Sequence, residues 1–270
     1  MKSIFAALLV VISLSSCNNT NQTNNTEEET KPKEQNTSKL AVQNKSEVNI
    51  DVKPISHASF VLQLDSLKLF IDPVSAEDFK PYGQPHYILV TDIHGDHFST
   101  ETLEAMPGEF SIIAPQAVYD QLSENLKSKT LVLNNRQSEQ LQTAFNLKAL
   151  PMYNITEGRL DKHPKGRGNA YVINYHDNKI YISGDTEDIK EMRALENIDM
   201  AFICMNLPYT MDLNQAADAV LEFKPKKVIP YHYRGVKDGK AYYEDVEEFK
   251  SIVTSNDASI EVELLDWYDM

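Results

Sequence analysis

Three short polar clusters in this chain each follow directly on an apolar run typical of a buried β-strand. The richest cluster, Thr91-Asp92-Ile93-His94-Gly95-Asp96-His97, comes directly after Ile88-Leu89-Val90; the others are Gly184-Asp185-Thr186 and Pro230-Tyr231-His232-Tyr233. Imidazole nitrogens and carboxylate oxygens are ligands that zinc accepts, and a glycine lets a loop bend so that neighbouring side chains converge. We therefore expect a fold that gathers the ends of several strands around a metal.

The hydrophobic pattern from Val48 onward predicts strands first and strand–helix alternation later. Predicted strands are Val48–Val52, a hairpin of Phe60–Leu64 and Leu67–Ile71, then Ile88–Val90, Leu147–Tyr153, Ala170–Tyr175, Lys179–Ser183, Met200–Met205, Lys227–Pro230 and Ile260–Leu265. One predicted helix begins at Ser99 or Thr100. Further helices are predicted over Pro115–Lys127, Glu187–Glu196, Leu213–Phe223 and Tyr243–Thr254. This order predicts a single α/β domain with two mixed sheets and helices packed outside.

Composition excludes several classes of protein. The 26 Lys and Arg against 40 Asp and Glu leave a net charge of −14, which argues against nucleic acid as a partner, because affinity for phosphate backbones comes from clustered cations. Two cysteines, Cys17 and Cys204, are too few for a disulfide framework or a zinc site built from thiolates. Cys204 lies in an apolar run, which predicts a buried core thiol.

The first residues predict a targeting segment. A basic start precedes the apolar run Ile4–Ile12, and Leu14-Ser15-Ser16-Cys17 resembles the lipobox of bacterial lipoproteins, whose cysteine is lipidated. Residues 18–39 contain no aliphatic or aromatic residue, so they cannot bury enough surface to fold. We expect a signal peptide over 1–16, a lipidated Cys17 with a disordered tether over 17–47, and a hydrolase domain over 48–270. This predicts a protein outside the cytoplasm, lipid-anchored to a bacterial membrane in the cell envelope; an ordinary signal peptide with a chance cysteine is the alternative.

The polar clusters also carry a family resemblance. Asp-x-His-x-Asp-His, followed by Gly-Asp-Thr and a strand-end His, resembles the metallo-β-lactamase superfamily. Further motifs resemble its branch related to L-ascorbate-6-phosphate lactonase: Ser56-His57-Ala58-Ser59-Phe60, Ile71-Asp72-Pro73, Pro151-Met152-Tyr153-Asn154, His163-Pro164-Lys165-Gly166 and Pro208-Tyr209-Thr210-Met211. The resemblance implies an αββα sandwich of two mixed β-sheets flanked by helices, with metals at one edge of both sheets.

The resemblance also implies a set of metal ligands. Asp96, His97 and His232 would bind the second metal, Asp185 would bridge both, and His94 would bind the first. The match weakens at the first metal, since Asp92 stands where the superfamily usually has His, and Asn154 stands where a further His is expected. We expect Asp92 and Asn154 as oxygen ligands, which suit Mn²⁺ or Mg²⁺ better than zinc.

Alternatives stay open at three of these positions. Asp92 can instead be a hydrogen-bond partner of His94, and Asn154 can be a capping residue. His163 can swing in from its loop as a ligand. One or two divalent ions are therefore expected, with Zn²⁺ foremost and Mn²⁺ or Mg²⁺ open at the first site.

The predicted activity is hydrolysis of an ester, lactone, amide or phosphoester by a metal-bound hydroxide, with Asp185 and Asp96 as the catalytic residues that position and orient it. His57 is expected to line the site. His163, Lys165 and Arg167 form a cationic loop in an acidic chain, which predicts binding of a small anionic substrate. The alternative function is a catalytically degenerate, membrane-tethered protein that binds a metal or ligand. Neither the substrate nor the oligomeric state follows from the sequence.

Overall fold

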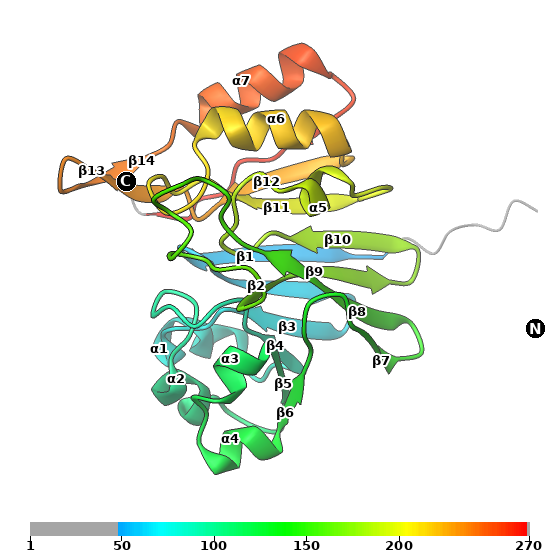
Figure 1. Ribbon diagram of the computed structural model, residues 1–270. Coiled ribbons are helices and arrows are strands. Elements are labelled where there is room, and N and C mark those ends of the chain that lie inside the picture. The colour runs from blue at the N-terminus through cyan, green and yellow to red at the C-terminus, as the bar shows by residue number, and fades with distance from the viewer. Residues whose placement is uncertain (1–47, 269–270) are drawn as a thin grey trace, which may run out of the picture. The chain divides into compact units, whose positions relative to one another are not determined.

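Two β-sheets stacked face to face form the centre of the molecule (Figure 1), in a computed structural model that describes residues 48–268. The first sheet has the order β1-β2-β3-β4-β5-β6 and the second β15-β12-β11-β10-β9-β8-β7. The strands of the first sheet are β1 (Ile50–Ser56), β2 (Ser59–Leu64), β3 (Leu67–Ile71), β4 (Tyr87–Leu89), β5 (Ser111–Ala114) and β6 (Thr130–Val132). Those of the second are β7 (Ser138–Gln142), β8 (Phe145–Met152), β9 (Gly168–Tyr175), β10 (Asn178–Ile182), β11 (Met200–Cys204), β12 (Lys227–Tyr231) and β15 (Glu261–Val262).

Both sheets are mixed. Strands β1, β2 and β3 pair antiparallel, and β3, β4, β5 and β6 pair parallel. In the second sheet β7 to β10 pair antiparallel, and β10, β11, β12 and β15 pair parallel. Because parallel strands end at the same edge of a sheet, the segments that follow β10 and β12 emerge together.

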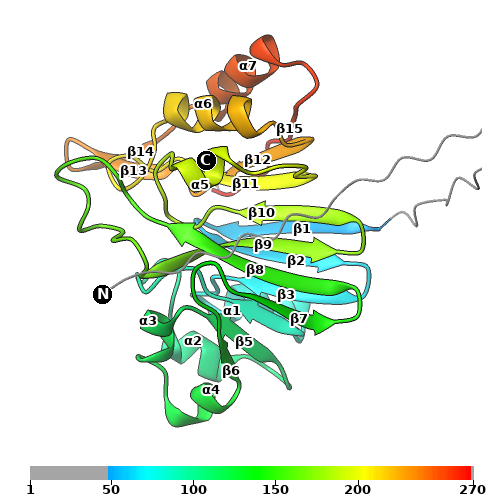
Figure 2. The same ribbon diagram turned by 45° about the vertical axis from the view of Figure 1, so that its right-hand side comes forward.

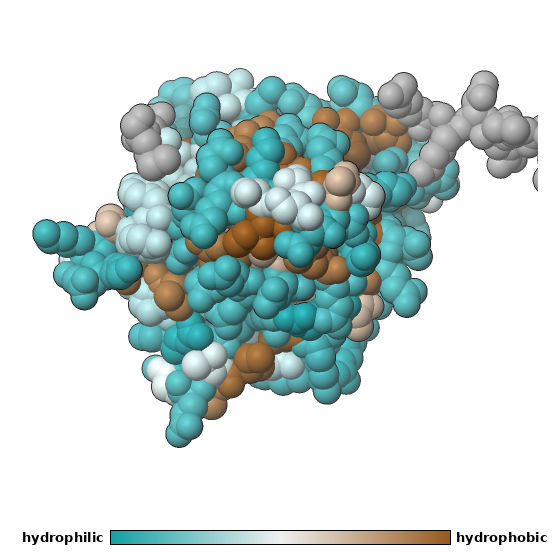
Figure 3. Space-filling model, turned by 90° about the horizontal axis from the view of Figure 1, so that it is seen from above, coloured by the Kyte–Doolittle hydropathy of each residue, from teal (hydrophilic) through white to brown (hydrophobic). Residues whose placement is uncertain are grey.

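Helices cover the outer faces of the sandwich. The first sheet is covered by α1 (Ala76–Phe79), η1 (Lys80–Tyr82), α2 (Thr100–Ala105), α3 (Gln116–Tyr119) and α4 (Glu124–Ser128), and the second by α5 (Lys190–Arg193), α6 (Leu213–Phe223) and α7 (Val246–Asn256). The face that carries α6 and α7 is mostly hydrophilic (Figure 3), as expected for amphipathic helices with their apolar side turned to a sheet. The predicted αββα sandwich is therefore confirmed.

The alternation within single strands builds two apolar layers. Phe60, Leu62 and Leu64 of β2 pack between the sheets with Phe145 of β8. Val61, from the opposite face of β2, packs in the layer beneath the helices. A period of two therefore serves both sides of the first sheet.

Several predicted elements differ from the observed ones. Residues 115–127 form two short helices, because Ser123 caps a new helix at Leu126 N instead of continuing the first. The helix predicted over Glu187–Glu196 is reduced to α5, since the Glu187 carboxylate binds the backbone N–H groups of Ile155 and Thr156. The final strand contains two residues only.

Strands β5, β6 and β7 were not predicted from the sequence, and neither was one hairpin. Strands β13 (Arg234–Lys237) and β14 (Lys240–Tyr243) pair antiparallel. This hairpin and the loop between β8 and β9 extend past the same edge of the sandwich (Figure 2). Together they frame that edge.

The predicted signal peptide, the lipidated Cys17 and the tether all lie outside the described residues. Among residues 48–268, none of the helices has the length and apolar character needed to span a bilayer.

Candidate metal centre

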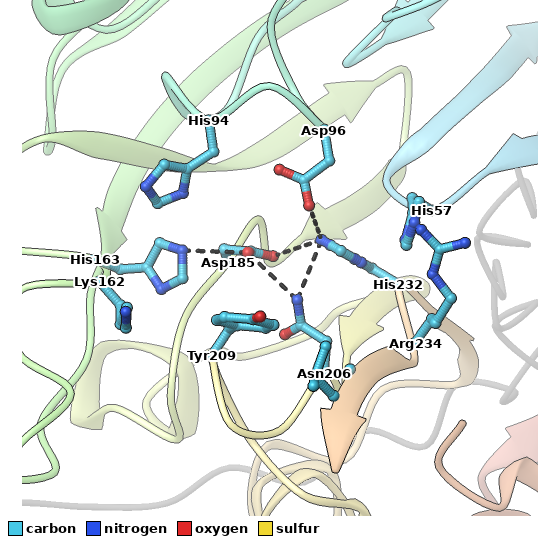
Figure 4. Close-up of a pocket in the computed structure, with 12 residues that line it drawn as sticks. His57, His94, Asp96, Lys162, His163, Asp185, Asn206, Tyr209, His232 and Arg234 are labelled. Carbon is cyan, nitrogen blue, oxygen red and sulfur yellow. Dashed lines mark hydrogen bonds and ion pairs between the residues drawn. The ribbon is translucent and has the colours of Figure 1, made fainter. Parts of the chain in front are cut away.

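A pocket of about 420 Å³ opens at the edge where the three polar clusters meet. Its walls come from the segments after β1, β4, β10, β11 and β12, and from the loop between β8 and β9 (Figure 4). The lining residues are His57, His94, Asp96, Lys162, His163, Asp185, Asn206, Tyr209, His232, Arg234, Gly235 and Val236. The convergence of strand ends predicted from the sequence is thus present in the fold.

Asp96, His97, Asp185 and His232 form one group of side chains, which we call the second cluster. His232 Nε2 lies 3.4 Å from Asp96 Oδ2 and 3.3 Å from Asp185 Oδ1. His97 Nε2 lies 3.4 Å from Asp185 Oδ2 and 3.9 Å from Asp96 Oδ1. The spacing of ligand atoms in Asp96, His97 and His232 suits a single metal ion.

Asp72, at the end of β3, orients His97. The Asp72 carboxylate lies 2.8 Å from His97 Nδ1 and accepts hydrogen bonds from Thr91 N and Thr91 Oγ1. All three side chains are buried. With Nδ1 held by the carboxylate, His97 presents Nε2 to the cluster, an arrangement that metal-binding histidines commonly share. The sequence predicted Asp72 only as part of the family motif Ile71-Asp72-Pro73, and this role was missed. An acidic residue directly after an apolar strand was the signal that could have indicated it.

The second cluster fits a divalent cation. His97 Nε2 and Asp185 Oδ1 are buried without a hydrogen-bond partner among the described residues, and such atoms are costly unless something else binds them. Asp96 and Asp185 carry two negative charges, and no lysine or arginine ion pair to either occurs within residues 48–268. One divalent ion would satisfy both the orphaned atoms and the charge.

The pKa values in the second cluster reflect the same excess of negative charge. Burial lowers the pKa of His232, but the carboxylates of Asp185 and Asp96 outweigh it and raise this pKa to about 9. Burial also lowers the pKa of His97, yet Asp185 and Asp72 raise it well above its usual range. Burial raises the pKa of the Asp185 carboxyl, but His232 and His97 hold it well below the ordinary value. The cluster thus attracts positive charge strongly.

Asp92, His94 and His163 form another group, which we call the first cluster. Asp92 Oδ2 lies 2.8 Å from His94 Nδ1 and 3.9 Å from His163 Nε2. His163 is buried and its Nε2 lies 3.2 Å from Asp185 Oδ2. His163 was predicted to bind substrate, with a role as metal ligand left open, and its ring nitrogens lie among the atoms that could hold a metal.

The other two cations predicted to bind substrate do not line the pocket. Lys165 binds Glu191 Oε1 and the Tyr153 hydroxyl, and Arg167 makes a bidentate ion pair with Asp92. Lys162 and Arg234 line the pocket instead. Sequence reasoning missed both, because the path of a loop of irregular structure decides which of its cations face inward.

Of the two remaining predicted residues, His57 lines the pocket and Asn154 does not. His57, at the turn between β1 and β2, lines the pocket beside His232 and lies 3.1 Å from the Tyr268 hydroxyl at Nδ1. Asn154 does not line the pocket; its Nδ2 donates to Arg159 O and Tyr209 O. It therefore joins the loop that carries His163 to the loop that carries Tyr209.

Comparison with known proteins identifies the family of this chain. Residues 51–232 match the family model described as the Beta-lactamase superfamily domain. A metal-dependent hydrolase of Pyrococcus horikoshii is 30% identical over an alignment of 217 residues, and the match covers 76% of this chain and 92% of that protein. The crystal structure of a candidate metal-dependent hydrolase from Parabacteroides distasonis has 34% identity, a TM-score of 0.73, and coverage of 83% of this chain and 96% of its own. A metallohydrolase from Ignicoccus hospitalis, at 20% identity, shares the fold with a TM-score of 0.67 and covers 82% of this chain and 96% of its own.

Proposed function

This chain belongs to the metallo-β-lactamase superfamily, and on that premise we propose that it is a metal-dependent hydrolase whose metal is held by Asp96, His97, Asp185 and His232. The observation that carries the proposal is the pair of buried, unpartnered ligand atoms, His97 Nε2 and Asp185 Oδ1. His97 Nε2 lies 3.4 Å from Asp185 Oδ2, and Asp185 Oδ1 lies 3.3 Å from His232 Nε2. Imidazole nitrogens and carboxylate oxygens are ligands that zinc accepts.

The side chains around the second cluster have different roles. A divalent ion, when bound, supplies a Lewis acid and makes water a stronger acid. Asp72 holds His97 with Nε2 turned inward. Asp96, with 42% of its side chain exposed, faces the pocket and orients the attacking water through its carboxylate. His163 lies on the other side of Asp185 from His232 (Figure 4), where a ring N–H would donate to the substrate oxygen that gains negative charge.

The substrate we propose is a small anionic ester, lactone, amide or phosphoester. Lys162 and Arg234 line the pocket at opposite ends (Figure 4), and neither side chain makes an ion pair with a carboxylate in the part of the chain that the structure describes. A guanidinium binds carboxylate or phosphate in a bidentate manner. The motifs that resemble the branch related to L-ascorbate-6-phosphate lactonase support membership of that branch.

We propose further that the protein acts outside the cytoplasm, anchored to a bacterial membrane by a lipid on Cys17. The support is the sequence of residues 1–47 alone: the apolar run, the lipobox-like cysteine and the polar segment that follows.

A second candidate function is a metal- or ligand-binding protein without turnover. The observation that favours it is the departure of the first cluster from the usual ligand set, with Asp92 engaged by Arg167.

The testing experiment pairs metal analysis with hydrolysis of a panel of lactones and phosphodiesters. Protein purified without chelator should contain metal and hydrolyse a panel member, and 1,10-phenanthroline should abolish the activity until zinc or manganese is restored. His232→Asn should remove both metal and activity, while His176→Asn should change neither. Both histidines have a left-handed backbone, with φ of 48° and 50°, which asparagine tolerates, so neither variant should add backbone strain, although His232 is buried and His176 is exposed. Metal binding without turnover would favour the second candidate.

A further inference from the structure

Arg167 occupies the first cluster in an unusual way. Its Nε donates to Asp92 Oδ1 at 3.1 Å, and its Nη2 donates to Asp92 Oδ2 at 3.0 Å. The same Nη2 lies 3.2 Å from His94 Nε2 and 2.6 Å from Lys162 O. The guanidinium therefore lies among the atoms that would otherwise face a metal.

The candidate ligands of the first cluster are largely engaged by protein groups. Both oxygens of Asp92 pair with Arg167, and both ring nitrogens of His94 have partners, Nδ1 with Asp92 and Nε2 with Arg167. Among the three side chains only His163 keeps ring nitrogens without a hydrogen bond. Together with the neighbouring Asp185 Oδ2, His163 provides two free ligand groups, fewer than the three protein ligands of a typical catalytic zinc site.

The charges of the two clusters also favour metal binding in the second cluster. In the first cluster the Arg167 cation balances the buried Asp92 carboxylate, and the bidentate pair is the strong form of this contact. In the second cluster the carboxylates of Asp96 and Asp185 have only imidazoles as ionic partners among residues 48–268. A divalent ion is therefore attracted more strongly by the carboxylates of the second cluster than by the neutralised carboxylate of the first.

We propose that Arg167 is a built-in cation that takes the place of the first metal, so that the chain binds one divalent ion, in the second cluster. Asp92 is then a partner of Arg167 and His94 rather than a metal ligand. A histidine at position 92 would offer no carboxylate to the guanidinium, so the substituted motif and the arginine complement each other. The inference rests on the proposed function in one respect, that the second cluster binds metal.

The test is metal stoichiometry in the full chain, measured by mass spectrometry after loading with zinc and exhaustive dialysis. Wild-type protein should retain one equivalent. Arg167→Met removes the cation and leaves Asp92 with His94 as its remaining close partner, so it should retain two. Arg159→Met is the matched control, because Arg159 belongs to the same loop and pairs with the buried Glu187 but not with either cluster; it should retain one.

Each outcome decides a separate point. Two equivalents in wild-type protein would overturn the inference and leave the proposed function standing. A folded Arg167→Met variant with one equivalent would also overturn it. No retained metal in wild-type protein would contradict the proposed function itself. Since wild-type stoichiometry needs no variant, the inference stays testable even where Arg167→Met does not fold.

Discussion

At the scale of single residues, Asp72 shows how a side chain outside the pocket can control the site. It is fully buried and fixes His97 by a carboxylate–imidazole contact. Replacing such a partner typically weakens metal affinity about 10–100-fold. We therefore expect Asp72→Asn to weaken zinc binding by about that factor, measured by competition with a chromogenic chelator.

The matched control for this prediction is Asp65→Asn. Asp65 is exposed and, like Asp72, has a positive φ, 52° against 44°. Equal zinc affinity in Asp72→Asn and wild type would show that the carboxylate does not act through His97.

Arg234 carries the second residue-scale prediction. Arg234→Gln keeps a polar group at the pocket wall but removes its charge, so KM for an anionic substrate should rise about tenfold while kcat changes little, because one charged hydrogen bond is worth about 1.5–3 kcal/mol. Lys240→Gln, an exposed cation of the same hairpin outside the pocket, should leave KM unchanged. Steady-state kinetics with an anionic substrate and its neutral analogue separate charge recognition from a general loss of activity.

The sequence located the strand-end residues that meet in the pocket but not the cations around it. Asp96, Asp185 and His232 each follow a strand, so the ends of the strands bring them together. Lys162 and Arg167 lie in a loop whose course depends on distant contacts, such as Arg167 with Asp92. A local pattern cannot reveal which loop cations point inward.

At the scale of elements, the loop between β8 and β9 is held by a buried carboxylate. Glu187 accepts hydrogen bonds from Ile155 N and Thr156 N at 2.7 Å and pairs with Arg159 at 2.8 Å. Removing one partner of a buried pair costs about 3–5 kcal/mol. Glu187→Ala should therefore lower the free energy of unfolding by about that amount, measured by urea denaturation.

Glu157→Ala is the control, because Glu157 is an exposed acid of the same loop. A loss in Glu187→Ala no greater than in Glu157→Ala would mean that the buried contacts do not stabilise the loop.

Elements with strong local signals were predicted well. The turn at Asp65-Ser66 placed the β2–β3 hairpin, and α6 has the predicted bounds, with Asp212 forming a capping box with Gln215. The hairpin of β13 and β14 was missed because its burial does not alternate along the strands, and Gly235 alone is buried among its strand residues. Hydrophobic periodicity reports burial, so it fails where an element is not buried.

At the scale of the whole molecule, the prediction concerns where the chain resides. If Cys17 carries a lipid, wild-type protein should partition with membranes, and Cys17→Ser should be recovered in the soluble fraction outside the cytoplasm. Cys204→Ser, which changes the buried second cysteine, should stay with the membrane. Fractionation followed by immunoblotting decides this, and wild-type protein found wholly in the soluble fraction would contradict the lipid anchor.

The second cluster draws its ligands from both sheets: Asp96 and His97 follow β4, while Asp185 and His232 follow β10 and β12. Asp96 and His232 are about 140 residues apart in the chain. An ion bound between them would act as a cross-link that closes this long loop, and the entropy lost by the unfolded chain grows with the length of the loop closed. Residues 48–268 contain one cysteine and therefore no disulfide among themselves. The metal would link the two sheets as well as take part in the reaction, and its binding energy would add to the free energy of folding.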